Sequence, residues 1–272
     1  MQGLPASGQW SFSLLYLYQD LDAPYGGSDE LPNPDGRRTL QRTLLLRGEV
    51  GLGERLAARA RLPLREIETS GGFDFQGEGL GDLEAELMWR LGPEEGRGGG
   101  AIGGGLSLPT AEDAPVDLVG ENVFFGAGAV SLLVTLEGYR KLAPGLTLFG
   151  SARYRRPFDE GDEAYRFGDD LGYQGTLAWS PGEGRFGVNV GASGQHLGRD
   201  EQAGVELDNR GGRFHYASLG VRFRLREGLD LGLAGSWLVD QDVRGDQLLA
   251  RQQATVGLSW SWGEHVHEHE AQ

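Results

Sequence analysis

The sequence predicts an all-β fold, namely a twelve-stranded antiparallel transmembrane β-barrel built as an up-and-down meander. Three observations predict it. Twelve stretches alternate apolar and polar residues, the connections between them alternate short and long, and aromatic residues gather at both ends of the apolar faces. One face of each strand in such a barrel meets lipid and the other meets the lumen, so the alternation is required.

The strands are predicted from this alternation, which is clearest in the first one. Phe12 lies on the apolar face and Ser13 on the polar one, while Leu15 and Leu17 break the pattern. Boundaries set this way are less reliable than the existence of each strand. The twelve predicted strands are 9–19, 38–50, 55–66, 80–91, 99–108, 126–140, 146–156, 170–180, 185–196, 213–225, 229–240 and 248–262.

The connections fall into two classes that differ in length. Tight turns rich in Gly and Pro follow the even-numbered strands, and longer polar loops follow the odd-numbered ones. Bacterial barrels have short periplasmic turns and longer extracellular loops, so we expect both termini in the periplasm. The loops are rich in acidic residues, which suits contact with lipopolysaccharide through bridging cations. They contain no Ca²⁺-loop motif. The predicted loops are 20–37, 67–79, 109–125, 157–169, 197–212 and 241–247.

Composition limits the classes of function. The 272 residues carry a net charge of −15 and no Cys, which argues against nucleic-acid binding and against thiolate metal sites. We expect no cofactor. A single barrel domain is predicted over 9–262, with a periplasmic lead at 1–8 and a His- and Glu-rich tail at 263–272. A barrel in the bacterial outer membrane requires a secretory signal, which we expect to have been removed from this chain.

The rival fold is a soluble β-sandwich, which would also alternate. Two aromatic girdles separated by small and aliphatic residues are what a bilayer requires, and a sandwich core gives no reason for them. The girdle near the tight turns is predicted to contain Trp10, Trp89, Trp179, Phe186, Phe223, Trp260 and Trp262, and the girdle near the loops Tyr18, Tyr154, Tyr173 and Trp237.

Two short motifs and the strand rhythm resemble a known family. The segment Gly79-Leu80-Gly81-Asp82-Leu83 and the later Leu106-Ser107-Leu108-Pro109-Thr110 are similar to those of the outer-membrane channel family associated with aromatic-degradation (phenol meta-pathway) gene clusters. This resemblance implies passage of small, often hydrophobic, molecules across the outer membrane, and it implies no catalytic residues.

The polar faces carry charges that we expect to line the pore. Antiparallel pairing is predicted to bring Arg59 beside Glu86 and Arg61 beside Glu84. Such pairs stiffen a wet lumen, and they also create a transverse field that selects solutes. The predicted pore-lining charges are Arg59, Arg61, Glu84, Glu86, Glu137, Arg153, Arg155, Arg222, Arg224, Asp230 and Arg251.

The predicted strand 99–108 is rich in glycine. We expect a bend there or a site where a loop folded inward approaches the wall, with deliberate widening of the channel as the alternative.

An enzyme was weighed because some barrels of this size hydrolyse lipids with a lipid-facing Ser and His. His196 and His215 are predicted on the lipid face, but Ser193 and Ser218 point to the lumen, so no nucleophile faces its base. We assign no catalytic residues. In the tail, His265, His267 and His269 share one face of an extended chain and suit a transition metal, although a solvated tail is the preferred interpretation and no metal site is assigned.

The function predicted from these features is an outer-membrane channel for passive diffusion of a small solute. The alternative is a structural barrel that anchors an envelope complex by docking a periplasmic protein partner. Expected contacts are outer-membrane lipid, lipopolysaccharide and the solute. The residues predicted to face lipid are Leu44, Leu46, Val130, Leu132, Val134, Leu231 and Leu233, and those predicted to face the lumen are Thr43, Ser131, Thr135 and Gly232.

Overall fold

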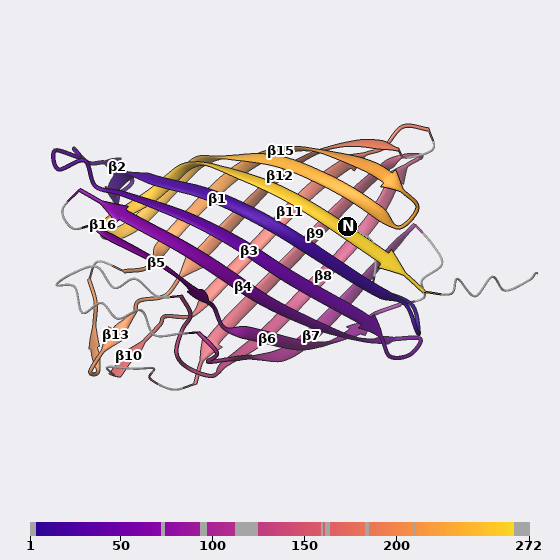
Figure 1. Ribbon diagram of the computed structural model, residues 1–272, viewed down its shortest axis with the longest axis horizontal. Helices are drawn as coiled ribbons and strands as arrows, with labels where there is room; N and C mark the ends of the chain where they lie inside the picture. Colours follow the sequence, from indigo (N-terminus) through magenta and orange to yellow (C-terminus); the bar gives the residue numbers. More distant parts are fainter. Residues whose placement is uncertain are drawn as a thin grey trace, which may run out of the picture.

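The protein is a closed antiparallel β-barrel whose strands tilt around the long axis (Figure 1). The computed structural model describes residues 4–71, 74–92, 97–111, 125–158, 160, 164–182, 185–208 and 210–263. No helix in these ranges has the length and apolar composition needed to cross a bilayer. The all-β class predicted from the alternation is confirmed.

Among the described residues, eleven strand elements form the ring, and five more lie outside it. The ring contains β1 (Trp10–Gly27), β3 (Arg38–Gly51), β4 (Leu56–Ser70), β6 (Leu83–Arg90), β7 (Gly98–Leu108), β8 (Ser131–Ala143), β9 (Leu146–Pro157), β11 (Asp170–Trp179), β12 (Phe186–Leu197), β15 (Gly212–Arg226) and β16 (Leu229–Trp262). Outside the ring are β2 (Asp29–Glu30), β5 (Phe75–Leu80), β10 (Tyr165–Arg166), β13 (Glu201–Gln202) and β14 (Val205–Glu206).

The ring closes where β1 pairs with β16, from Trp10 opposite Trp262 onward. Closure by the two ends of the chain was predicted, because an open edge leaves backbone groups unpaired in hydrocarbon. The element β16 contains both of the last two predicted strands. Its residues up to Val243 pair with β15, and its residues from Val243 onward pair with β1. The ring therefore has eleven strand elements where twelve were predicted.

The predicted strand 80–91 is interrupted in the structure. Residues 64–69 of β4 pair with β5, residues 56–61 pair with β6, and the break at Gly81 and Asp82 lies opposite Pro63. A proline has no N–H to give to a neighbouring strand and is found at such irregularities. At the break, the N–H of Gly81 donates to the carbonyl of Pro63 at 2.7 Å.

The loop end of the barrel is more ordered than the sequence predicts. The strands β1 and β4 extend several residues past their predicted ends, and β10, β13 and β14 form a separate three-stranded sheet inside two predicted loops. Figure 1 shows β2, β10 and β13 together at the end opposite the tight turns. Tyr165 anchors the small sheet, being 3% exposed and donating its hydroxyl to Asp200.

The outer surface is apolar, as a lipid-facing wall must be. Val190, Leu136 and Leu87 are more than half exposed although they lie within strands. The alternation on β8 follows the prediction in part. Val134 is exposed and Thr135 buried, as expected, and Val130 lies before the strand begins. Leu133, with no exposed surface, packs on the inner side between Gly105 and Arg155.

Candidate functional site

A cavity of about 2010 Å³ occupies the lumen. Strands from the whole ring line it, including Leu15 of β1, Thr135 of β8 and Ser193 of β12. Its described lining contains nine arginines and four carboxylates and no lysine, so the lumen is basic although the whole chain is acidic. These charged residues are Arg47, Arg61, Arg65, Arg90, Arg153, Arg185, Arg222, Arg224, Arg226, Glu49, Glu137, Glu227 and Asp230.

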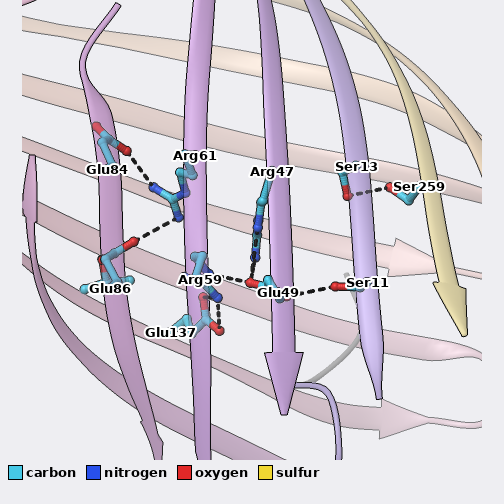
Figure 2. A network of polar contacts seen from close by, with 11 residues as sticks. Ser11, Ser13, Arg47, Glu49, Arg59, Arg61, Glu84, Glu86, Glu137 and Ser259 are labelled. Carbon is cyan, nitrogen blue, oxygen red and sulfur yellow. Dashed lines mark hydrogen bonds and ion pairs between the residues drawn. The ribbon is translucent and has the colours of Figure 1, made fainter. Parts of the chain in front are cut away.

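Arg59 is the centre of a buried charge network in the wall (Figure 2). Its side chain is 1% exposed. The guanidinium donates to Glu49 of β3 and, through Nη2, to both oxygens of Glu137 of β8 at 2.9 and 3.0 Å. Arg47 and Ser11 donate to the same Glu49 carboxylate. One buried cation thus links three strand elements through charge-assisted hydrogen bonds.

A second group of charges lies beside the first one. The predicted register is confirmed, with Arg59 opposite Glu86 and Arg61 opposite Glu84. Arg61 lies between these carboxylates at 3.8 Å from Glu84 and 3.7 Å from Glu86, distances too long for hydrogen bonds. Arg153 of β9 reaches Glu84 at 2.6 Å. Arg59 itself bonds with Glu49 and Glu137 rather than with its register partner Glu86.

The glycines of β7 explain how side chains reach across the wall. A Cβ at Gly103 would lie 2.2 Å from the Sδ of Met88, and one at Gly105 would lie 2.0 Å from the carbonyl oxygen of Ala85. Met88 has no exposed surface. The glycines therefore serve close packing against β6. The face of β7 that carries Gly103 and Gly105 has only small residues. The side chain of Arg59 on β4 therefore passes over β7 and reaches Glu137 on β8.

An apolar wall completes the lumen, and the sequence did not predict it. Leu15 and Leu17, the exceptions to the alternation, line the cavity. The signal that could have revealed this wall is the presence of leucines at positions where the alternation calls for polar residues. Its cavity-lining members are Leu15, Leu17, Leu21, Phe214, Tyr216 and Leu249.

The N-terminal segment from Leu4 lies against the barrel end, where the sequence predicted a periplasmic lead. Leu4 packs with Ala57, Met88 and Ala101 and is 7% exposed. Arg90 donates to the Leu4 carbonyl at 2.8 Å. The segment also lies so close to Gly51 that a Cβ there would come within 1.9 Å of the carbonyl oxygen of Ala6. Residues 1–3 lie outside the described ranges.

The predicted pore-lining charges occupy four kinds of position. Two of them, Arg59 and Glu86, are buried inside the wall at 3% and 4% exposure. Two more, Glu84 and Arg155, line a second cavity of about 110 Å³ with Arg65 and Asp82. The main cavity is lined by Arg61, Glu137, Arg153, Arg222, Arg224 and Asp230.

Arg251 lies elsewhere. Its side chain is half exposed and pairs with Glu30 of β2 at 2.5 Å, away from the cavity lining. The register between β1 and β16 shifts after Gln19, so that Gln253 and Ala250 line the cavity and the alternation that placed Arg251 inward is broken. A β-bulge reverses the face on which the residues after it lie, and the alternation of the sequence does not reveal this one.

The predicted girdle residues lie mainly on the outer surface. The exposed fractions of Trp10, Trp89, Tyr173, Trp179, Trp237, Trp260 and Trp262 are between 42% and 50%, and Tyr18 and Tyr154 are intermediate. Amphipathic rings at this exposure suit the two lipid–water interfaces.

His215 has partners that the sequence did not predict. Its Nε2 lies 2.6 Å from the hydroxyl of Tyr173 and its Nδ1 lies 2.9 Å from Asp240. Ser193 lines the lumen cavity, on the other face of the sheet. The arrangement holds the imidazole at the outer surface between a phenol and a carboxylate. Among the described residues no three His, Asp or Glu side chains gather in a way that could hold a metal ion. His265, His267 and His269 lie outside the described ranges.

Comparison with solved structures shows the same fold in outer-membrane proteins. An outer membrane channel from Pseudomonas putida F1 matches with a TM-score of 0.75 at 13% identity, over 96% of this chain and 97% of the other. A mutant of the TodX monoaromatic hydrocarbon channel matches with a TM-score of 0.53 at 12% identity, over 96% and 91% of the two chains. The NanC porin matches with a TM-score of 0.52 at 9% identity, over 92% and 98%. No curated protein matches the sequence.

The closed ring and the apolar outer wall give the protein the fold of an outer-membrane β-barrel, which these neighbours share. A family model matches residues 38–251, which is more than half of the chain. The chain belongs to the family described as "Putative MetA-pathway of phenol degradation".

Proposed function

We propose that the protein is a channel through which a small solute diffuses passively across the outer membrane. The observation that carries this proposal is the cavity of about 2010 Å³, which lies inside a lipid-facing wall and is lined by charged, polar and apolar side chains. A lumen filled by packed side chains, as in the smallest barrels, would leave no such volume. Two proteins with the same fold, an outer membrane channel and the TodX monoaromatic hydrocarbon channel, support this role.

The proposal includes twelve membrane crossings, with β16 crossing twice. Its 34 residues would extend over about 110 Å at 3.3 Å per residue, far beyond the ~30 Å hydrocarbon core. The N–H of Ser261 donates to the carbonyl of Gly228 at 2.8 Å, so the two ends of β16 lie side by side. An even number of crossings then places both chain ends with the tight turns, in the periplasm.

Labelling of single cysteines in intact cells tests this topology, because the natural chain has no Cys. Asp35→Cys lies in the exposed connection between β2 and β3, and Glu54→Cys lies in the tight turn between β3 and β4. We expect a membrane-impermeant maleimide to label the first variant and to leave the second unlabelled. The reverse pattern would invert the orientation.

Planar-bilayer recordings test the channel. We expect the purified protein to show single-channel currents in KCl. Silence in bilayers, together with capture of a periplasmic protein by the same preparation, would favour the alternative of an anchoring barrel.

A further inference from the structure

The lumen is amphipathic. The apolar wall and a basic wall, which consists of Arg61, Arg65 and Arg153, line the same cavity. Leu17 of β1, Thr43 of β3 and Arg65 of β4 are register partners in turn, so the basic wall begins two strands from the leucines. On the other side, Arg153 of β9 connects to Phe214 of β15 through register partners on β11 and β12. An arginine therefore lies two strands from the apolar wall on one side and three strands from it on the other.

The arginines of the basic wall are unevenly paired, because Arg61 and Arg153 share Glu84 and only Arg61 also lies near Glu86, at 3.7 Å. One carboxylate oxygen, Oε2 of Glu84, serves both Arg61 at 3.8 Å and Arg153 at 2.6 Å. Within the described part of the chain Arg65 forms no ion pair, and its Nε is buried with no hydrogen-bond partner. A buried guanidinium N–H without an acceptor is costly, and an ionised carboxylate is the group that satisfies it best.

The side chain of Arg153 is 30% exposed, with its Nε and Nη2 buried. A Cβ added to its register partner Gly172 would meet no atom within 4 Å. Arg61, Arg65 and Arg153 all line the main cavity, as do Leu15, Leu17, Phe214 and Tyr216 of the apolar wall. A solute in this cavity can therefore meet arginine side chains and apolar side chains at the same time.

We propose that the lumen binds monocarboxylates that have an apolar body. Arg61, Arg65 and Arg153 hold the carboxylate, and the apolar wall packs against the body. This inference rests on the proposed channel function and names its substrate class. Charge-assisted bonds from guanidinium to carboxylate fix the headgroup, and burial of the body supplies the remaining affinity.

Calorimetric titration of the full chain in lipid nanodiscs tests the site, with empty nanodiscs to subtract partition into lipid. The probes are 4-phenylbutyrate, its neutral analogue 4-phenylbutyramide, and butyrate, which lacks the ring. We expect 4-phenylbutyrate to bind at least about tenfold more tightly than either of the others at low salt. Equal affinity for the acid and the amide, or no binding of the acid, overturns the proposal.

Two variants assign the affinity to the two walls. Arg61→Gln, Arg65→Gln and Arg153→Gln together are expected to weaken 4-phenylbutyrate by about tenfold or more and to leave the amide unchanged. Leu15→Asn with Leu17→Asn is expected to bring the affinity for 4-phenylbutyrate towards that for butyrate. If the triple variant fails to refold, judged by heat-modifiable gel mobility, Arg65→Gln alone replaces it.

A matched control removes three arginines that lie outside the cavity. Arg42, Arg166 and Arg199 form ion pairs with Glu66, Glu201 and Glu206 at the surface. Their joint replacement by Gln is expected to leave binding intact, and an equal loss in this control would overturn the assignment to the lumen.

Single-channel currents recorded on the same preparation separate the two proposals. A current without carboxylate binding would contradict only the proposed substrate class. Carboxylate binding without a current would contradict only the proposed channel function.

Discussion

Arg59 shows what a buried charge requires at the scale of a single residue. Its guanidinium is removed from water and held by Glu49 and Glu137, which come from strands on either side of its own. Burial of the charge is tolerated because both partners are ionised and correctly placed, and removal of either one leaves an uncompensated charge.

We predict that Arg59→Met destabilises the barrel by about 3–5 kcal/mol, because Glu137 loses its cation and Glu49 keeps only Arg47. Urea unfolding of the protein refolded in detergent micelles measures the change. Arg199→Gln breaks an exposed pair and should leave the midpoint unchanged. Equal midpoints for Arg59→Met and the wild type would show that the network does not stabilise the fold.

The second prediction concerns which residues face lipid and which face the lumen. Leu136 is 52% exposed near the middle of β8, whereas Gly172 lies on the lumen side with open space before it. Leu136→Arg should cost about 2–4 kcal/mol because its charge enters hydrocarbon, and Gly172→Arg should cost little. Refolding yields in liposomes measure the difference. A Leu136→Arg variant that inserts as well as Gly172→Arg would show that the outer face is not in lipid.

At the scale of elements, β7 is the strand whose composition most constrains its neighbours. Gly104 and Gly105 are adjacent, yet a Cβ at Gly104 meets nothing within 4 Å while one at Gly105 meets backbone of β6. Gly105→Ala should therefore destabilise the barrel by about 1–3 kcal/mol through overpacking. Gly104→Ala, its matched control, should be neutral or slightly stabilising in the same urea experiment. Equal effects at the two positions would contradict close packing of β6 on β7.

The small sheet of β10, β13 and β14 responds to pH through Tyr165. Burial, together with the hydrogen bond to Asp200, raises the pKa of this phenol above its ordinary value. The folded sheet holds the proton that the unfolded segment releases, so its stability is full below about pH 10 and falls as the pH rises further. The protection factors of residues 201–206, which are exchange rates corrected for the base-catalysed intrinsic rate, should fall above that pH. Tyr165→Phe should abolish this fall, and an unchanged fall in that variant would exclude Tyr165 as the source.

The elements also show how far the sequence could predict the structure. Alternation located every strand of the ring, because a lipid face and a lumen face impose it throughout. It placed Arg251 on the wrong face, because a bulge shifts the register between β1 and β16. It also missed the break at Gly81, because the proline that causes it lies on the neighbouring strand β4. It also missed the apolar wall that contains Leu15 and Leu17. Where both faces of a strand carry leucine, the alternation does not tell which face meets lipid and which meets the lumen. The position of Leu4 inside the barrel end depends on tertiary contacts with β4, β6 and β7.

At the scale of the whole molecule, the charge of the lumen and the charge of the chain have opposite signs. The chain carries a net charge of −15, whereas nine arginines and four carboxylates line the described cavity. The acidic residues that set the overall charge lie largely in the loops, where water and salt screen them. Fixed charges that line a narrow passage through a low-dielectric wall act on a permeating ion more strongly than those in the loops do.

We therefore predict that the open pore prefers anions weakly and loses the preference as salt rises, because the screening length falls from about 10 Å at 0.1 M to about 3 Å at 1 M. Reversal potentials under a KCl gradient measure it. Replacement of Arg61, Arg153 and Arg222 by Gln should shift the reversal potential towards the cation side, and Arg59→Met should shift it less, because Arg59 is buried between two carboxylates and is absent from the cavity lining. A clear cation preference in the wild type, or a reversal potential unmoved by the triple replacement, would show that these arginines do not set the field that a permeating ion meets.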